Sequence, residues 1–261
     1  MENQKPRYGN WISRKVILWQ TIGTLLAVAA ANIVRPCSRP WGSVLMLAAA
    51  VLCALTTYML YARVALSYEG GGVQGKILDD VLARLDETGW NGRGKLLDIG
   101  CGSGALSVKA AKKYPRALIS GVDTWGAAWE YSQRLCEENA RLEGVSSRIT
   151  FRKDSAADMD FLDDMFDAAV SNFVFHEVRS QPDKRALVQE ALRVVRPGGY
   201  FVFQDVFFSK SCYGKIDDFV ESLKPYVSEI HFVDTRRPKY APRFLNTPLV
   251  LGQMGLIYGR K

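Results

Sequence analysis

The residues best suited to chemistry surround a glycine cluster, Gly-Cys-Gly-Ser-Gly at 100–104. An apolar run at 96–99 that contains Asp98 precedes the cluster, and a helical pattern follows it. Glycines at such a turn let the backbone approach a ligand closely, and the N–H groups that begin the next helix can bind it. The spacing G-x-G-x-G, with no Lys-Ser or Lys-Thr after it, matches neither a dinucleotide nor a nucleoside triphosphate motif well. Asp98 would repel a phosphate and attract an ammonium group.

Two more acids stand where the next apolar runs end. Asp123, followed by Thr124, ends one run, and Asp154, followed by Ser155, ends another. An acid about twenty residues after the glycine turn can accept hydrogen bonds from both hydroxyls of a ribose, although Asp123 alone would fit an ordinary turn equally well. Asp154 could face an adenine amino group. Because the carboxyl ends of parallel strands meet at one edge of a sheet, the three acids fit a single ligand in a crevice there.

His176 and Asp205 are candidate proton acceptors at the same sheet edge. Both follow expected strands, where a base could reach a nucleophile in the crevice. Each also has a purely structural explanation, since a histidine can hydrogen-bond a loop and an aspartate can cap a turn. Asn172 could exchange a hydrogen bond with a ligand through its amide. Cys101 fits the glycine turn by its small size, and a reactive thiol would need a lowered pKa.

Short apolar runs alternate with helical patterns throughout residues 76–261. An amphipathic helix at 77–85 comes first. The elements expected after it are strand 96–99, helix 105–113, strand 117–122, helix 127–142, strand 149–151, strand 166–171, helix 184–195, strand 200–206, strand 230–233 and strand 250–258. This alternation is typical of βαβ units and predicts an α/β fold with a parallel, doubly wound sheet, the last two strands pairing at its edge.

Together these motifs resemble the class I S-adenosylmethionine-dependent methyltransferases over residues 76–206. The matching pieces are L-L-D-I-G-C-G-S-G at 96–104, the strand-end Asp123, Asp154 with Ser155, F-D-A-A-V-S-N at 166–172, and L-R-V-V-R-P-G-G-Y-F-V at 192–202. The resemblance implies a Rossmann-like sheet of seven strands with the last strand antiparallel.

The resemblance also implies a cofactor site and a role for its parts. Asp98 would hold the methionine end of S-adenosylmethionine, Asp123 the ribose and Asp154 the adenine. The other expected cofactor residues are Gly100, Cys101, Gly102, Gly104, Thr124, Ser155 and Asn172. Methyl transfer from a sulfonium is an in-line displacement, so the protein mainly holds the nucleophile about 3 Å from the methyl group and excludes water. No metal is expected.

The segment F-V-F-H-E-V at 173–178 bears on the methyl acceptor. It is similar to a V-L-H-H-V stretch of the enzymes that methylate quinones and sterols, which suggests a small lipophilic acceptor. Glu177 departs from that pattern and puts the transfer of a substrate in doubt.

Two long apolar segments precede this domain. Residues 16–34 and 41–62 carry no charge, and each is long enough to cross a hydrocarbon core, which takes roughly 20 helical residues. The loop between them contains two prolines and two arginines and permits a tight reversal. A signal peptide is the competing interpretation of the first segment, but no small-residue cleavage site is clear. We expect a transmembrane hairpin within residues 1–66, a Gly-rich linker at 67–75 and the methyltransferase domain at 76–261.

Charge indicates the orientation and the partners. Four cations precede the first segment and two occupy the loop, so the positive-inside rule places both ends of the hairpin, and the catalytic domain, on the cytoplasmic side. The net charge of +7 would suit nucleic acid, anionic lipid or an acidic substrate. The basic cluster at 236–239 is expected to be a solvated loop, so no nucleic acid partner is expected. The five cysteines lack the spacing of a zinc site or of a disulfide framework.

The sequence therefore predicts a multi-pass membrane protein that methylates a lipophilic or membrane-associated small molecule in contact with membrane lipid. A bilayer concentrates a dissolved substrate beside a tethered site. Two alternatives remain open: a methyltransferase that modifies a membrane protein, and a membrane sensor that binds S-adenosylmethionine without turnover. The sequence leaves open the acceptor atom, which could be C, N, O or S, and the oligomeric state.

Overall fold

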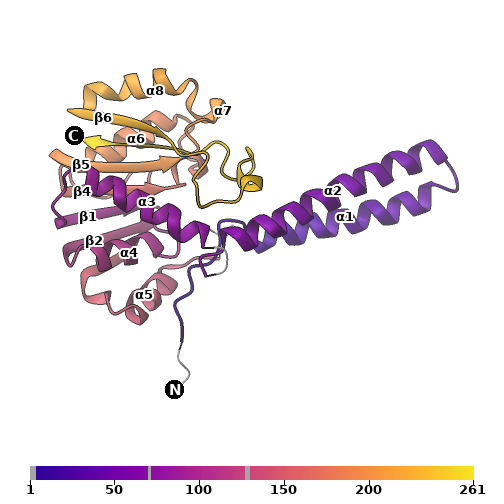
Figure 1. Cartoon of the computed structure of the whole chain (residues 1–261), viewed down its shortest axis with the longest axis horizontal. Coiled ribbons are helices and arrows are strands. Elements are labelled where there is room, and N and C mark those ends of the chain that lie inside the picture. Colours follow the sequence, from indigo (N-terminus) through magenta and orange to yellow (C-terminus); the bar gives the residue numbers. More distant parts are fainter. Residues whose placement is uncertain (1–3, 70–71, 127–129) are drawn as a thin grey trace. The chain divides into compact units, whose positions relative to one another are not determined.

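The structure is a computed structural model that describes residues 4–69, 72–126 and 130–261 (Figure 1). The described residues form two units. The sheet unit contains residues 4–9, 74–126 and 131–261, and the hairpin unit contains residues 10–73 with residue 130. Two expectations fall partly outside the described residues, namely Gly70 and Gly71 of the linker and the start of the helix expected at 127–142.

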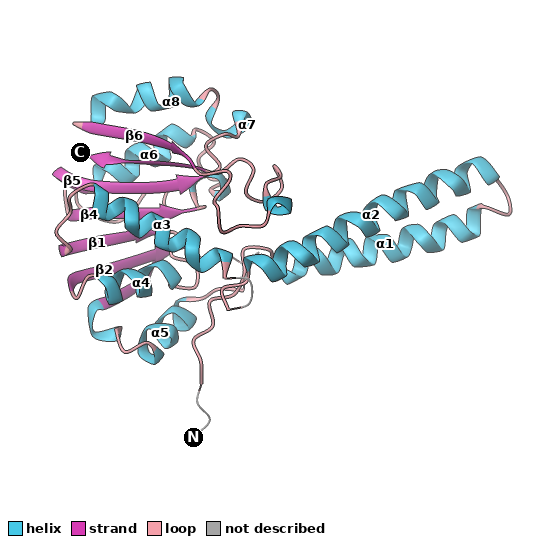
Figure 2. Ribbon diagram, in the orientation of Figure 1, coloured by secondary structure: helices cyan, strands magenta, loops and turns pink. Residues whose placement is uncertain are grey.

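The sheet unit is built on seven strands in the order β3-β2-β1-β4-β5-β7-β6 (Figure 2). The strands are β1 (Arg93–Ile99), β2 (Arg116–Asp123), β3 (Ile149–Lys153), β4 (Phe166–Asn172), β5 (Val195–Asp205), β6 (Glu229–Asp234) and β7 (Gly255–Arg260). The first five are parallel, and β7 lies antiparallel between β5 and β6. The predicted seven-stranded α/β fold with an antiparallel last strand is confirmed.

Helices cover both faces of this sheet. They are α3 (Val73–Glu87), α4 (Ala105–Lys113), α5 (Gln133–Leu142), α6 (Lys184–Arg193), α7 (Lys210–Tyr213) and α8 (Ile216–Leu223). In Figure 2, α3 and α4 lie in front of the central strands and α6 lies behind them. The central strands are consequently buried on both sides and show continuous apolar runs rather than alternation, as in β5, where Phe201, Val202 and Phe203 are fully buried.

Several expected boundaries are wrong, among them the start of the strand expected at 200–206, which begins at Val195 as β5. The described part of the helix expected at 127–142 begins only at Gln133, because the Ser132 hydroxyl caps it by accepting a hydrogen bond from Leu135 N at 3.2 Å. The last strand begins at Gly255 rather than 250, since a turn closes before it. The helix α3 begins at Val73, inside the expected linker.

The strand order places a crevice between β1 and β4. After β1 the chain builds β2 and β3 on one side, and β4 and β5 then extend the sheet on the other. Neighbouring connections therefore diverge at the carboxyl ends of β1 and β4, which is where doubly wound sheets bind ligands. The glycine cluster follows β1 directly, so the fold brings it to this point.

The hairpin unit consists of α1 (Arg14–Val34) and α2 (Arg39–Leu66). Small residues of α2 are buried at seven-residue intervals, namely Gly42, Ala49 and Thr56, which is the spacing of a helix–helix seam. Large apolar side chains point outward instead, with Trp19 70 % and Ile33 74 % exposed. The observed helices extend slightly beyond the expected spans at 16–34 and 41–62.

Candidate cofactor and acceptor site

The turn after β1 has a backbone that requires glycine. Gly100, Gly102 and Gly104 have φ angles of 70°, 55° and 78°, in the left-handed region that strains other residues. A Cβ on Gly100 would lie 2.2 Å from Val174 Cγ2, whereas the described atom nearest to a Cβ on Gly102 belongs to the Tyr131 ring, at 3.5 Å. The turn is therefore packed at Gly100 and open at Gly102, where a ligand can approach the backbone.

Asp98 lies beneath this turn and is 1 % exposed. Its Oδ2 accepts a hydrogen bond from the Ser107 hydroxyl at 2.5 Å. Burial, with the charge of Asp123 in addition, raises the pKa of Asp98 to about 7 despite that hydrogen bond. A cation bound at the turn would favour the ionised carboxylate and offset the cost of its desolvation.

Asp123 braces the glycine turn from the end of β2. One carboxylate oxygen accepts a hydrogen bond from Gly102 N at 2.9 Å, and the other accepts one from Trp125 N at 2.7 Å. The Trp125 indole donates to Gly102 O at 2.9 Å and so closes a ring of contacts. The carboxylate keeps lone pairs for a ligand, since each oxygen can accept two hydrogen bonds. Thr124 is exposed beside it.

Asp154 is held within the turn after β3. Its Oδ2 accepts hydrogen bonds from Arg152 Nη2 at 2.6 Å and from Asp160 N at 3.1 Å, and its Oδ1 accepts one from Ser155 N at 2.8 Å. The Ser155 hydroxyl accepts a hydrogen bond from Ala157 N at 3.2 Å. These bonds fix the turn, and the hydrogen bond expected between Asp154 and an adenine amino group stays a prediction.

Asn172 ends β4 next to the crevice. Its side-chain oxygen is buried and has no hydrogen-bond partner among the residues that the structure describes. The next residue, Phe173, has a φ of 57° and turns the chain away from the sheet. A buried acceptor without a partner is costly, so the position favours a ligand that donates a hydrogen bond there.

Cys101 shows no sign of a reactive thiol. The side chain is buried, and burial, followed by the hydrogen bond with Cys136, raises its pKa well above the ordinary value. The neutral thiol is a poor nucleophile. This agrees with the interpretation that its small size suits the glycine turn.

His176 and Asp205 are brought into direct contact. His176 lies in a short 3-10 turn at Phe175–Glu177, and Asp205 ends β5 and is fully buried. The His176 ring Nδ1 contacts Asp205 Oδ1, and His176 N donates to Asp205 Oδ2 at 3.1 Å. The other ring nitrogen lies 3.4 Å from Glu177 Oε1. The imidazole is thus held between two carboxylates.

The two carboxylates set the charge of His176. Burial alone would lower its pKa, but the charge and hydrogen bond of Asp205, together with Glu177, raise it to about 10. The same contact lowers the pKa of Glu177. Burial and the charge of Asp205 raise the pKa of the nearby Tyr213 hydroxyl. At neutral pH the cluster therefore contains an imidazolium that can donate a hydrogen bond but not accept a proton.

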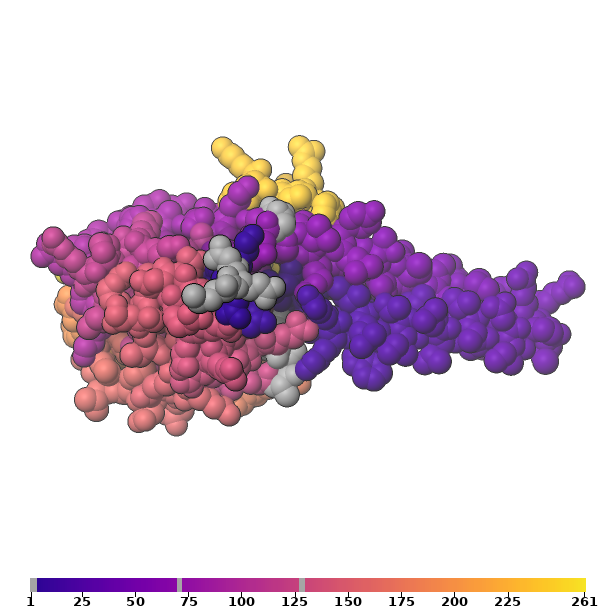
Figure 3. Space-filling model, turned by 90° about the horizontal axis from the view of Figure 1, so that it is seen from below, coloured from indigo at the N-terminus to yellow at the C-terminus, as the bar shows by residue number. Residues whose placement is uncertain are grey.

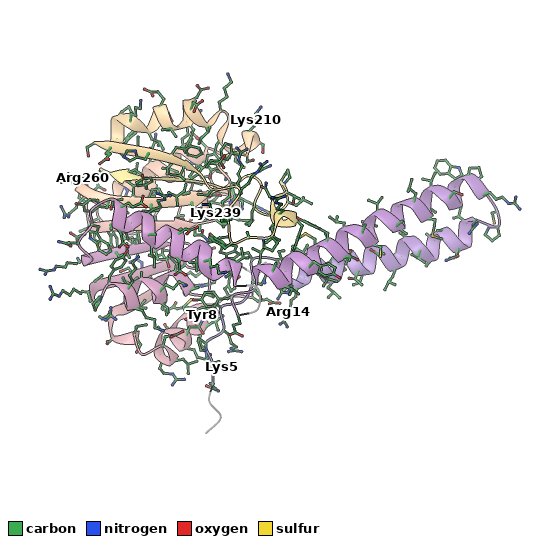
Figure 4. The ribbon with its side chains drawn as sticks, viewed as in Figure 1. Lys5, Tyr8, Arg14, Lys210, Lys239 and Arg260 are labelled. Carbon is green, nitrogen blue, oxygen red and sulfur yellow. The ribbon has the colours of Figure 1, made fainter. Side chains whose placement is uncertain are left out.

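The beginning of the chain lies against the cofactor side of the sheet unit (Figures 3 and 4). We call residues 7–9 the N-terminal strap. Arg7 exchanges two backbone hydrogen bonds with the Asn139 side chain, at 2.8 and 2.9 Å, and the Tyr8 hydroxyl donates to Glu143 at 3.0 Å. The Asn139 amide also donates to Ser103 O, within the glycine turn, at 3.0 Å. One buried amide therefore joins the strap to the turn.

Comparison with known proteins agrees with this geometry. Residues 97–203 match the family described as "Methyltransferase domain". The chain contains a class I S-adenosylmethionine-dependent methyltransferase domain.

Individual relatives resemble the methyltransferase domain at modest identity. Methyltransferase GfsG of Streptomyces halstedii is 27 % identical over 144 residues, which cover 55 % of this chain and 46 % of that protein. The sterol 24-C-methyltransferase erg6 of Aspergillus fumigatus is 31 % identical over 107 residues, which cover 41 % of this chain and 26 % of the relative. The chain thus spans about half the length of the first relative and about a quarter of the second. Relatives of similar identity are named for rRNA and for a ribosomal protein.

Solved structures share the fold of the methyltransferase domain. One is a geranyl diphosphate C-methyltransferase from Streptomyces coelicolor A3(2), with a TM-score of 0.53 at 16 % identity, over 69 % of this chain and 76 % of that one. At this identity the likeness concerns the fold alone.

The methyltransferase domain also contains contacts that sequence reasoning missed. Trp125 closes the glycine turn, Asn139 connects the strap, and Tyr213 lies near Asp205. The sequence gives one hint of the Trp125 contact, which is that this aromatic residue stands two positions after Asp123. The contacts of Asn139 with Arg7 join positions 132 residues apart and left no pattern in the sequence.

The residues present fit S-adenosylmethionine. A buried carboxyl group that a cation would ionise, an open glycine backbone and the unpaired Asn172 oxygen lie at the carboxyl ends of the neighbouring strands β1 and β4. When bound, the cofactor supplies an electrophilic methyl group next to a sulfonium. The residues named above would bind and orient it.

Proposed function

We propose that the chain is an S-adenosylmethionine-dependent methyltransferase that acts on a lipophilic or membrane-associated small molecule. The observation that carries this proposal is the pair formed by half-buried His176 and fully buried Asp205, at the carboxyl edge of the sheet where the glycine turn also lies. A domain that only sensed the cofactor would not need a buried charged pair at that edge, because burying charges is expensive.

The chemistry follows from the charges. Asp98 favours the cationic end of the cofactor, and Asp123 accepts hydrogen bonds from the ribose. His176, protonated and oriented by Asp205, would orient the acceptor through its other ring nitrogen, which lies 3.4 Å from Glu177 Oε1 and must give up that contact to donate a hydrogen bond to the acceptor. The raised pKa favours this donor role over the proton acceptor that the sequence suggested for His176.

The hairpin supports a membrane anchor. The two helices have mean hydropathies of 1.7 and 2.1, and only 6 % and 11 % of their most apolar windows are buried. A core helix of a soluble protein would be mostly buried, and a signal sequence would account for α1 but not for α2. Outward-facing apolar side chains around a seam of small residues suit a lipid environment.

The strap supports an orientation in which both ends of the hairpin lie on one side. Residues 7 and 8 precede α1, yet they hydrogen-bond to the methyltransferase domain that follows α2. The excess of positive charge before α1 over the loop favours the cytoplasm for that side. An acceptor dissolved in the bilayer would then be concentrated beside the site, and the name of the sterol relative is consistent with such an acceptor.

Labelled-methyl transfer tests the function. The full chain in lipid nanodiscs is incubated with methyl-labelled S-adenosylmethionine and a membrane extract that contains both lipids and proteins, with Asp205→Asn as the matched variant. We expect label in the organic extract that depends on Asp205. Label in a membrane protein would instead show that the acceptor is a protein, and cofactor binding without label in either fraction would show a sensor.

The native cysteines test the orientation. Cys37 is exposed in the loop between the two helices. A membrane-impermeant maleimide added outside intact cells should label Cys37, and Cys37→Ser should abolish that label. Labelling only after the membrane is opened would refute the orientation.

A further inference from the structure

The loop between β6 and β7 lines an open basic cavity. Its volume is about 700 Å³, and its lining residues are Arg236, Arg237, Pro238, Lys239, Ala241, Pro242, Arg243, Asn246 and Leu251. Four of these are cations and none is acidic. The cluster at 236–239 lies in a loop with Arg237 and Lys239 exposed, as the sequence suggested, and the structure adds that this loop borders a hollow. Figure 4 labels Lys239 on this loop.

The loop is held in shape by its own contacts. The Arg236 guanidinium pairs with Asp234, Nη2 to Oδ2 at 2.6 Å, and stacks on the Phe208 ring at 3.7 Å. Leu245 and Leu251 are buried, and Leu251 N donates to Leu245 O at 3.0 Å. With its amide in the orientation that satisfies both atoms, Asn246 donates to Arg236 O at 2.8 Å and accepts from Arg237 Nε at 3.0 Å. The cavity is therefore a built feature.

The four cations outnumber the acid beside them, Asp234, which pairs with Arg236 and also interacts with the charge of Arg237. Among the described residues, Arg236 has an ion-pair partner in Asp234, whereas none is found for Arg237, Lys239 or Arg243. All three are exposed. Cations clustered without counter-charges repel one another, and an anion placed among them would relieve that repulsion.

The cavity adjoins the acceptor end of the sheet. In the strand register Gly255, which begins β7, lies opposite both Asp205 and Asp234. The loop that leaves β6 after Asp234 and enters β7 at Gly255 therefore lies at the edge that carries the His176–Asp205 pair. Phe208, three residues after Asp205, supports Arg236 and donates through its backbone to Gln253 O at 3.0 Å.

We propose that this cavity binds a phosphate ester or diphosphate group of the methyl acceptor. Arginine forks match phosphate oxygens in paired hydrogen bonds, and a lysine adds a point charge. Phe244 and Leu249 of the same loop are 43 % and 65 % exposed, so apolar surface borders the basic cavity. Both features together fit an amphiphile with a phosphorylated head and an apolar body. This substrate class rests on the function proposed above.

Pyrophosphate binding tests the site without requiring turnover. The full chain in phosphatidylcholine nanodiscs is titrated with inorganic pyrophosphate by calorimetry. The variant Arg237→Gln/Lys239→Gln/Arg243→Gln should weaken binding about tenfold or more, because each charge-assisted hydrogen bond is worth more than about 1 kcal/mol. The control changes three exposed cations outside the cavity, with the same loss of charge, and is Arg116→Gln/Arg141→Gln/Lys215→Gln. Cofactor affinity should be unchanged in both variants, which checks that they fold.

The outcomes separate the cavity from net charge and from the proposed function. Equal weakening in both triple variants would overturn the site, because net charge would then explain the binding. Phosphatidic acid in the nanodisc should displace pyrophosphate if a lipid headgroup supplies the phosphate, and should not if a soluble ester does. With a phosphorylated acceptor, the cavity variant should raise KM and leave kcat unchanged. Pyrophosphate binding with no methyl transfer to any acceptor would leave the site standing and refute the proposed function.

Discussion

Asp98 should make cofactor affinity depend on pH. Its carboxyl group is 1 % exposed, and burial, with the charge of Asp123, raises its pKa to about 7. S-adenosylmethionine carries a sulfonium and an ammonium group, and such charges favour the ionised carboxylate. Affinity should therefore increase as the pH rises through 7, and binding below pH 7 should release a proton.

The size of the effect follows from the ionised fraction. With a pKa of about 7, roughly a tenth of the chains carry the carboxylate at pH 6 and roughly three quarters at pH 7.5. If the cofactor requires the ionised form, its Kd falls roughly eightfold over this interval, in proportion to the competent fraction.

Calorimetry of the full chain in detergent measures both quantities. Titrations at the two pH values give the ratio of Kd, and titrations in buffers of different ionisation enthalpy give the number of protons released. Asp98→Asn should bind more weakly at pH 7.5 and lose the pH dependence. An unchanged Kd in the wild type, or the same dependence in Asp98→Asn, would refute this account of the site.

Three further predictions concern the turn, the charged pair and the strap. In urea unfolding, Gly100→Ala should lower the free energy of unfolding by about 3 kcal/mol, because of backbone strain and a clash with Val174. Gly102→Ala should lower it by about 1 kcal/mol from strain alone, but should weaken cofactor binding more than Gly100→Ala does. Equal losses of stability would contradict the geometry. The free energy of unfolding of the wild type should exceed that of His176→Gln most below the unfolded-state pKa of about 6.5, and this difference should disappear as the pH rises through the folded-state pKa of about 10. A difference that does not change with pH would argue against the ion pair. Asn139→Ala should raise the cofactor Kd about fivefold, whereas Glu138→Gln, which removes only the exposed ion pair with Arg7, should not; equal Kd values would exclude a link between strap and turn.

The fold was predictable because its signals are local. The strand–turn–helix around Gly100–Gly104 and the acids that end β2 and β3 follow from apolar runs and glycines within a few residues of one another. Boundaries were less predictable where a cap overrides periodicity. Ser132 starts α5 later than the apolar pattern of 127–142 suggests, because its side chain satisfies the first N–H groups of the helix.

The candidate site was predictable in its members but not in its contacts. Sequence reasoning placed both His176 and Asp205 at the crevice, whereas their pairing across 29 positions depends on the turn that Phe173 makes with a φ of 57°. The charge of His176 could not be inferred either, since it depends on two carboxylates meeting one buried ring. The basic cavity was missed because a run of cations predicts solvation unless tertiary contacts such as Arg236 on Phe208 fold it back.

The strap also connects the anchor with the chemistry. Its hydrogen bonds to Asn139 require that residue 7, before α1, and the methyltransferase domain, after α2, share one aqueous compartment. A single membrane crossing would put the bilayer between them and break these hydrogen bonds. The strap would then no longer be joined through Asn139 to Ser103 O. The two crossings proposed above keep both segments on one side. The outward-facing apolar surface of both helices favours two, since without a bilayer side chains such as Trp19 and Ile33 would stand in water.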